Sequence, residues 1–301
     1  MSDHCLSQTY VAASHQLDNA CTWLRDVGID YSKTRIGRYR NLFSDLAKYQ
    51  LANTLHKFFE KHTFDEWVNA AHETAELVRI YEGLSGSTDA SLVSRLRSAT
   101  RGHELYILDN DDRSGRDLTF ELSVAAKFAR HGYIVNFGHD ADIETIVEGT
   151  TFYVECKRLK SAQQIQKRIK DALKQLHNRY KGSHNPFESR GILALSIGKT
   201  INPALGLLEA QNAANLGKKA FAHNAAFIEK YRSYWQTKVD PRSLGVIVVL
   251  DTPGMLSVEK KLVTVHETTM NNCMPAGTKD YRLLLRVTKE VFKKRPSTNE
   301  F

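Results

Sequence analysis

Apolar side chains recur every three or four residues over the first hundred positions, most regularly through 39–61 and 64–83. This is the period of one face of an α-helix, and no run typical of a strand interrupts it. The segment GLSGST at 83–88 is the first clear break. The pattern therefore predicts a helical N-terminal accessory region over residues 1–110, which ends in a polar hinge, DNDDRSG, at 109–115.

From residue 116 onwards the pattern changes to a mixture of helices and strands. Residues 117–131 keep the helical period and end at Gly132, a residue type that commonly terminates helices. Short runs bounded by turn residues follow, as is typical of strands. These three predicted strands span 133–137, 142–147 and 152–157, and a turn at 148–151 joins the last two.

The rest of the chain continues this mixed pattern. Ser161 and Gln164 have the spacing of a capping box, which predicts a helix that begins at Ser161 and ends near Tyr180. The further predicted elements are a buried strand at 192–197, a helical region at 204–236, a strand at 244–250, weaker strands near 262–267 and 282–287, and a polar tail at 293–301. We therefore expect an α/β domain with a C-terminal α/β extension over residues 111–301.

The composition is that of an ordinary globular protein, since 42% of the 301 residues are hydrophobic and 25% are charged. The longest apolar run, GVIVVL at 245–250, is far too short to span a membrane, and the N-terminus has no secretory signal pattern. The four cysteines are scattered, without the spacing of a zinc module or a disulfide framework. These features predict a reduced, cytoplasmic setting and no membrane association.

The net charge of +8 is unevenly distributed along the chain. Residues 1–100 are nearly neutral at −1, whereas residues 101–155 carry −6 and residues 156–200 carry +9. Each charged stretch is open to two interpretations, a solvated surface or a functional surface. On the functional interpretation, a cation site lies next to a segment that binds a polyanion.

The second and third predicted strands are expected to pair as an antiparallel hairpin. With a loop at 149–150, Asp142 lies opposite Lys157, and Glu144 lies opposite Glu155. Because side chains alternate along a strand, all four then project from one face, although a slip in the loop would change the partners. Several unpaired charges on a core face would cost too much free energy. Carboxylates are ligands that Mg²⁺ prefers, so this cluster favours a metal site.

One further acid lies on the apolar stripe of the helix predicted at 117–131. Glu121 shares this stripe with the apolar residues three, four and seven positions further on. A carboxylate in such a place needs a partner. Two kinds of partner remain open: a basic neighbour such as Lys127 or Arg130, or the hairpin, where Glu121 would join the metal.

The order of these elements and acids resembles the PD-(D/E)XK nuclease superfamily, whose restriction-endonuclease-like core has the order αβββαβ and a mixed central sheet. The resemblance covers roughly residues 116–198. It rests on Asp142 at the start of one strand and on Glu155 and Lys157, two residues apart, at the end of the next. Ala141 stands where the motif has proline, and Asp140 competes with Asp142 for the position of the motif aspartate.

The resemblance implies a role for each of four residues. Asp142 and Glu155 would bind the metal, Glu121 would be a further metal-binding acid, and Lys157 would be the catalytic lysine that assists the attacking water. All four would thus belong to the catalytic set, with Mg²⁺ as the implied cofactor and Mn²⁺ as its substitute. Cys156 faces the opposite way and is expected to be a core residue.

The basic excess is concentrated in the segment 158–181, which holds a single acid, Asp171. Apolar residues at helical spacing place its basic side chains on the outer face of the predicted helix. Contacts with the phosphates of a nucleic acid explain this excess better than solvation does. The expected contact residues are Arg158, Lys160, Lys167, Arg168, Lys170 and Lys174. The segment YSKTRIGRYR at 31–40 is equally consistent with a nucleic-acid contact and with a surface loop.

Together these features predict a metal-dependent nuclease that hydrolyses DNA, and by analogy a restriction or anti-phage defence protein. Two alternatives stay open. One is a nuclease-fold protein that binds DNA without cleaving it. The other is a nuclease subunit that only a partner protein activates. The N-terminal helices are the expected contact surface for such a partner or for a second copy of the chain in a homodimer. No phosphate-binding loop of the G-x-x-x-x-G-K-[ST] type occurs, so nucleotide hydrolysis is not expected.

Overall fold

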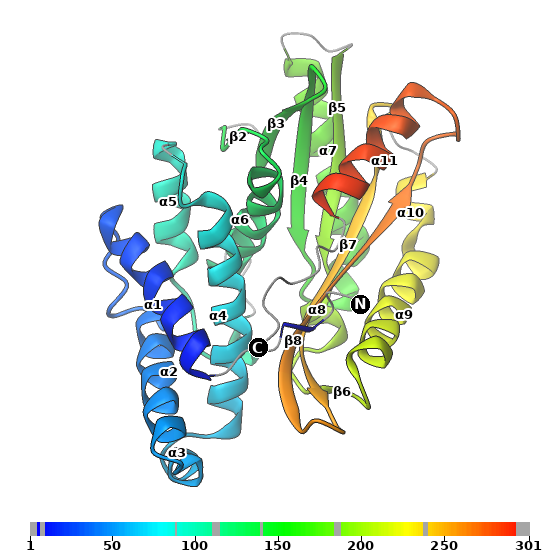
Figure 1. The fold of residues 1–301 in the computed structure, drawn as a ribbon. Helices are drawn as coiled ribbons and strands as arrows, with labels where there is room; N and C mark the ends of the chain where they lie inside the picture. The colour runs from blue at the N-terminus through cyan, green and yellow to red at the C-terminus, as the bar shows by residue number, and fades with distance from the viewer. Residues whose placement is uncertain are drawn as a thin grey trace.

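A mixed β-sheet forms the centre of the computed structural model, which describes residues 5–6, 10–87, 89–109, 115–138, 141–183, 188–236 and 240–292 (Figure 1). The strand order is β1-β8-β7-β5-β4-β3-β2, and β6 pairs with β7. Strands β4, β5 and β7 run parallel to one another, whereas β2, β3 and β4 form antiparallel pairs, as do β7, β8 and β1. The bounds of the strands are β1 Cys5–Leu6, β2 Val135–Asn136, β3 Ile143–Val147, β4 Thr150–Arg158, β5 Ser189–Ser196, β6 Leu208–Ala210, β7 Ser243–Leu256 and β8 Lys261–Asn272.

Helices cover both faces of this sheet. The helices α1 to α5 lie together on one side of the view, in blue to cyan (Figure 1). The bounds of the helices are α1 Tyr10–Asp26, α2 Arg35–Leu51, α3 Leu55–Lys61, α4 Phe64–Leu84, α5 Ala90–Ala99, α6 Gly115–Arg130, α7 Ile165–Gly182, α8 Gly198–Ile201, α9 Ala213–Tyr231, α10 Ser233–Gln236 and α11 Lys279–Val291, with short 3₁₀ turns at Tyr106–Leu108 and Ala162–Gln164.

The protein has a large apolar cluster on each face of the sheet. Phe152 and Val154 of β4 belong to the cluster that also contains side chains of α1, α2, α4, α6 and α11. Tyr153 and Leu159, which point the other way, belong to the cluster with α7, α9 and α10. The predicted helical character of the N-terminal region is confirmed, but its helices share a core with the sheet. The short strand β1 also joins the sheet from this region, through pairing with β8.

The order of elements around the hairpin is α6, β2, β3, β4, α7 and β5, as the pattern of the sequence predicted. The register of the hairpin is different from the predicted one. Glu148 and Gly149 have φ angles of 50° and 75° and form the two-residue turn, since this turn type needs positive φ at both positions. The pairing is therefore shifted by two residues, with Ile143 opposite Val154. A shift of two residues changes the partners but leaves every side chain on its predicted face.

Three other predictions of local structure were wrong. Ser161 makes no capping hydrogen bond through its side chain, and a 3₁₀ turn precedes α7. The helical region predicted at 204–236 begins with the strand β6 instead. The weak strand predicted at 282–287 is part of α11, whose buried residues Leu283, Leu284, Val287 and Val291 have helical spacing.

Several predicted features fall outside the described residues: the hinge at 110–114, the alternative motif residue Asp140 and the polar tail at 293–301. Within the described ranges, no helix combines the length and the apolar character that crossing a membrane requires.

Candidate functional site

The candidate site lies where β4 extends beyond the start of its antiparallel neighbour β3. Because Ile143 is the first residue of β3 and pairs with Val154, the last residues of β4 have no partner strand on that side among the described residues. Asp142, immediately before β3, replaces one hydrogen bond that a partner strand would make. Its Oδ2 accepts a hydrogen bond of 2.7 Å from the backbone N–H of Cys156. The carboxylate is thus oriented by a backbone amide that would otherwise lack a partner.

Lys157 connects the two carboxylates that the motif requires. Its Nζ lies 2.6 Å from Glu155 Oε1 and 3.9 Å from Asp142 Oδ2. One ammonium group thus contacts both acids, so the two carboxylates lie on the same side of the hairpin, as predicted. Cys156 is buried in the core on the opposite face, also as predicted. Glu144 of β3 lies opposite Tyr153 of β4. The predicted cross-strand pairing of Glu144 with Glu155 was therefore wrong.

Glu155 is the least satisfied of these acids. Its side chain is almost completely buried, and Oε2 has no hydrogen-bond partner among the described residues. Burial, together with the nearby Asp142, raises the pKa of Glu155 to about 7, although Lys157 and Arg179 of α7 act in the other direction. Burial lowers the pKa of Lys157, but Glu155 and Asp142 outweigh this effect and raise it overall. The pair therefore favours a charged lysine beside a carboxylate that readily takes up a proton or a second cation.

Glu121 approaches the same place from α6, the helix that packs on the other face of β4. Its Oε2 lies 2.6 Å from Nη1 of Arg95 on α5. Burial and then Asp142 raise the pKa of Glu121 to about 8, while Arg95 and Lys157 lower it. The two basic neighbours considered from the sequence have other contacts, since Lys127 bonds to Thr268 and Arg130 to Glu82. Glu121 therefore does lie near the hairpin acids, and its ionic partner comes from the N-terminal region.

Within the described ranges, no three His, Cys, Asp or Glu side chains gather closely enough to hold a metal ion. The three-carboxylate arrangement that the resemblance implies is thus not assembled. The donor set does fit a hard cation held by two carboxylates, Asp142 and Glu155, because Mg²⁺ commonly binds one or two carboxylates and keeps several waters for the rest. The unsatisfied Oε2 of buried Glu155 is the observation that supports this fit.

The basic segment 158–181 divides into an interior part and a surface part. On α7, Lys167, Lys170 and Lys174 are exposed and Arg168 is half-buried, as expected for contacts with an external polyanion. The apolar residues of α7 face the sheet, and the exposed lysines lie on the opposite side. These four residues keep the placement that the sequence predicted.

Arg158 and Lys160 do not lie on this outer face, contrary to the prediction. Arg158 ends β4, and alternation turns it to the face opposite Lys157, where it is buried, bonds to Asp109 and lies over the ring of Tyr106. Lys160 Nζ lies 3.1 Å from Asp117 Oδ2. Arg158 is therefore paired with an acid inside the protein, and half-buried Lys160 is paired with Asp117.

A second charged cluster, which the pattern of the sequence did not predict, is buried between the N-terminal helices and the sheet. Glu73 of α4 accepts hydrogen bonds from Arg35 and Arg116, and Arg79 of α4 pairs with Asp251 of β7 at 3.1 Å. The one available signal is that α4 carries charged residues on a helix that is otherwise buried. These pairs join elements that are distant in sequence, so they serve to hold the helices on the sheet.

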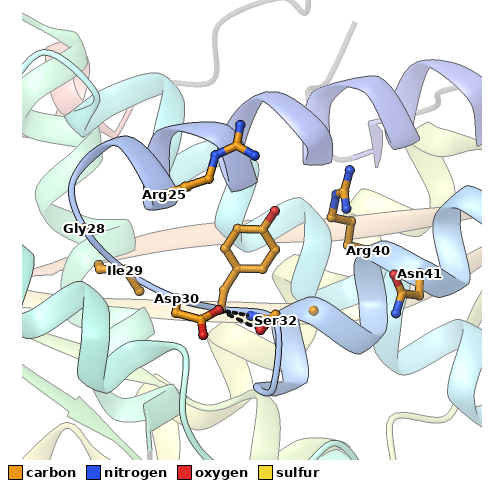
Figure 2. Close-up of a pocket in the computed structure, with 9 residues that line it drawn as sticks. Arg25, Gly28, Ile29, Asp30, Ser32, Arg40 and Asn41 are labelled. Carbon is orange, nitrogen blue, oxygen red and sulfur yellow. Dashed lines mark hydrogen bonds between the residues drawn. The ribbon is translucent and has the colours of Figure 1, made fainter.

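A separate pocket of about 560 Å³ lies between the end of α1 and the start of α2, in the segment 31–40 that the sequence had marked as a possible contact (Figure 2). Arg25 and Arg40 extend from the two helices to its rim. Arg40 pairs with Asp18 at 2.7 Å, and Asp30, whose Oδ1 accepts from Ser32, also lines the pocket. The charge of this pocket is mixed, so we assign no function to it.

No protein-family model, curated protein or solved structure matches the chain. The functional argument therefore depends on the geometry of the chain itself.

Proposed function

We propose that the chain is a metal-dependent nuclease that hydrolyses phosphodiester bonds of DNA on a PD-(D/E)XK-like core. One observation carries this proposal: Lys157 contacts the carboxylates of both Asp142 and Glu155, and buried Glu155 Oε2 has no hydrogen-bond partner among the described residues. The element order from α6 to β5, with an antiparallel β2-β3-β4 and a parallel β4-β5 pair, is in line with the αβββαβ core that the resemblance implies.

Each of the four residues has a distinct task under this proposal. Asp142 and Glu155 would hold Mg²⁺ or Mn²⁺, and Glu121 would approach these two acids from α6. A bound ion would lower the pKa of a coordinated water and would neutralise charge on the phosphate. Lys157 orients the attacking water and stabilises the negative charge that develops on the phosphate oxygens. The backbone N–H of Cys156 keeps Asp142 in place for this work.

The surface lysines of α7 would supply the contact with the DNA backbone. Lys167, Lys170 and Lys174 are exposed on one helix that packs against β4, the strand that carries Glu155 and Lys157. Arg179, on the same helix, acts electrostatically on Glu155, so the positive charge of α7 extends to the acids. A phosphate backbone lying along α7 would thus meet the candidate site.

A cleavage assay tests the proposal. Linear, nicked and supercoiled DNA are incubated with the wild type and with Lys157→Met, in the presence of Mg²⁺, Mn²⁺ or a chelator. We expect cleavage by the wild type only with metal, and a loss of at least about 100-fold in Lys157→Met, as for removal of one transition-state contact. Lys127→Met, a change of a half-buried lysine on α6, is the matched control for effects on folding.

Three results would count against this function. Binding of DNA without cleavage would favour the non-catalytic alternative. Cleavage that survives in both Lys157→Met and Glu155→Gln would place the active site elsewhere. Cleavage that persists in the chelator would exclude the metal.

A second candidate function, a nuclease activated by a partner protein, is favoured by an exposed aromatic cluster on the N-terminal helices. Phe59 and Phe64 are each 45% exposed, and their rings lie 5.5 Å and 5.3 Å from that of Trp67. Exposed Leu51 is a further apolar residue of this helical region. Large exposed apolar side chains in a group are typical of protein contacts. Cleavage that appears only after a partner is added, and that Phe59→Ser abolishes, would support this candidate.

A further inference from the structure

Arg95 reaches the candidate site from the N-terminal helices, where the sequence pointed to no site residue. Its Nη1 lies 2.6 Å from Glu121 Oε2, and the side chain is 20% exposed. Its guanidinium carbon also lies 5.5 Å from the centre of the Phe137 ring. The guanidinium group thus contacts both a carboxylate and an aromatic ring, a combination that suits arginine.

The helix that carries Arg95 is fixed to the segment between β2 and β3, which leads to Asp142. Asp89 makes this connection: its Oδ1 accepts from the backbone N–H of Ser91 at 2.8 Å and caps α5, while its Oδ2 accepts from the backbone N–H of Phe137 at 3.3 Å. Leu92 and Leu96 of α5 are buried in the core that α6 also enters. Arg95 is therefore held in position by packing, by a cap and by a ring contact, in addition to its bond with Glu121.

Glu121 needs a cationic partner because two other acids lie close to it. It interacts unfavourably with Asp142 and with Glu155, and favourably with Arg95 and Lys157. Lys157 is already in contact with the other two acids. Arg95 is thus the cation that is bonded directly to Glu121.

We infer that Arg95 is a positioning residue of the nuclease site, which holds the Glu121 carboxylate beside the two-carboxylate site of Asp142 and Glu155 and supplies its counter-charge. The N-terminal region then completes the site and does more than flank it. The inference rests on the proposed function, because the orientation of Glu121 matters for catalysis only if these acids hold a cation. Lysine cannot replace Arg95 fully, since a planar guanidinium stacks on Phe137 while it bonds to Glu121.

The test compares Arg95→Met, Arg95→Lys and Glu121→Gln with the wild type by Mn²⁺ titration calorimetry without DNA, by cleavage kinetics and by thermal unfolding. We expect Arg95→Met to weaken Mn²⁺ binding and to lower kcat, each by about 10-fold or more, as for loss of a group that orients a ligand. The KM for DNA stays within about twofold, because Arg95 acts through Glu121. Arg95→Lys recovers part of kcat.

Arg97→Met is the matched control on the same helix. Arg97 bonds to the carbonyl of Gly28 at 3.5 Å, so we expect this variant to leave Mn²⁺ binding, cleavage kinetics and thermal unfolding unchanged.

The combination of Arg95→Met with Glu121→Gln decides whether Arg95 acts through Glu121. The inference requires that Arg95→Met costs nothing further once Glu121→Gln is present. An equal loss in that background, unchanged Mn²⁺ affinity in Arg95→Met, or a rise in KM alone would overturn it. If Arg95→Met does not fold, the cycle of Arg95→Lys with Glu121→Gln gives the same decision.

The two proposals can fail separately. If the wild type cleaves no DNA but Arg95→Met binds Mn²⁺ more weakly than the wild type, the nuclease proposal is refuted and the positioning role is kept. If the wild type cleaves DNA and Arg95→Met does so equally well, the positioning role is refuted and the nuclease proposal is kept. A wild type that binds no Mn²⁺ refutes both.

Discussion

Two buried glutamates of this protein differ in how their charge is compensated. Glu73 on α4 is 2% exposed and Glu155 on β4 is 1% exposed. Both oxygens of Glu73 accept hydrogen bonds from arginine side chains, from Arg35 at 3.0 Å and from Arg116. Glu155 has Lys157 on one oxygen and, among the described residues, no hydrogen-bond partner on the other.

The pKa values of the two carboxyl groups move in opposite directions for this reason. Burial raises the pKa of Glu73, but Arg116 and Arg35 outweigh it and lower the pKa to about 2. For Glu155, burial and Asp142 outweigh Lys157, and the pKa rises to about 7. A buried carboxylate with a full set of partners is part of the structure, whereas one with an incomplete set favours a ligand that the fold does not supply.

The largest effect on folding is expected for Glu73→Gln. The change leaves two buried guanidinium groups without their counter-charge, so the free energy of unfolding should fall by about 3–5 kcal/mol. Urea unfolding followed by circular dichroism measures this loss. Glu155→Gln, equally buried, should change the same free energy by less than about 1 kcal/mol at neutral pH, because a pKa of about 7 leaves roughly half of the Glu155 carboxyl groups protonated there. Equal losses in the two variants would break the comparison.

Catalytic activity should show the reverse order. Glu155→Gln removes a carboxylate that would hold the metal, so we expect DNA cleavage to fall by at least about 100-fold, while the fold is kept. Asp142→Asn should have a similar effect, since both acids contact the same lysine. Initial cleavage rates at saturating Mg²⁺ measure the loss. Glu144→Gln is the control, because Glu144 lies on β3 two residues after Asp142. This variant should retain activity.

The stabilisation of the protein by Mg²⁺ should increase with pH. The pKa values of Glu155 and Glu121 are raised from 4.5 to about 7 and about 8, so the metal-free protein loses the corresponding stability as pH rises from about 4.5 up to these values. Metal binding needs the ionised carboxylates, so Mg²⁺ should raise Tm by several degrees near about pH 8.5 and hardly at all near about pH 5.5. Differential scanning fluorimetry with and without Mg²⁺ checks this, and Asp142→Asn should abolish the pH-dependent difference. Glu73, whose pKa is about 2, contributes nothing over this range.

The smallest effect is expected on the surface of α7. Changing exposed Lys167, Lys170 and Lys174 to Gln should weaken DNA binding and lower the slope of log K against log salt concentration by about one per lysine. Fluorescence anisotropy over a series of salt concentrations measures the slope. The same change at Lys218, Lys219 and Lys230 of α9 is the matched control, because these lysines are also exposed but α9 packs against β7 and β8, away from the candidate site. An equal change of slope in both triple variants would remove α7 from the proposal.

Periodicity along the chain predicted much of the candidate site correctly. The alternation of side chains along β4 places Glu155 and Lys157 on one face and Cys156 on the other, and this depends only on the extended backbone. The helical period of α6 placed Glu121 on a buried stripe. Neither inference needs to know what lies across the fold.

The partners of these residues could not be predicted in the same way. The register of the hairpin depends on positive φ at Glu148, which the sequence alone did not reveal, and the predicted opposition of Asp142 and Lys157 was therefore wrong. Arg158 and Lys160 were expected to bind phosphates, but they are paired with Asp109 and Asp117. Whether a cation is available is decided by acids that the fold brings near.

The sequence by itself determined the order of helices and strands from α6 to β5, the face on which each acid lies and the segregation of negative from positive charge. These follow from local periodicity, because backbone geometry repeats every 2 or 3.6 residues whatever the surroundings. The tertiary structure alone decided that Arg95 meets Glu121, that two arginines satisfy Glu73, and that one oxygen of Glu155 is left without a partner among the described residues. Such contacts join elements far apart in the chain, and their free energy depends on burial and distance, which exist only once the chain has folded.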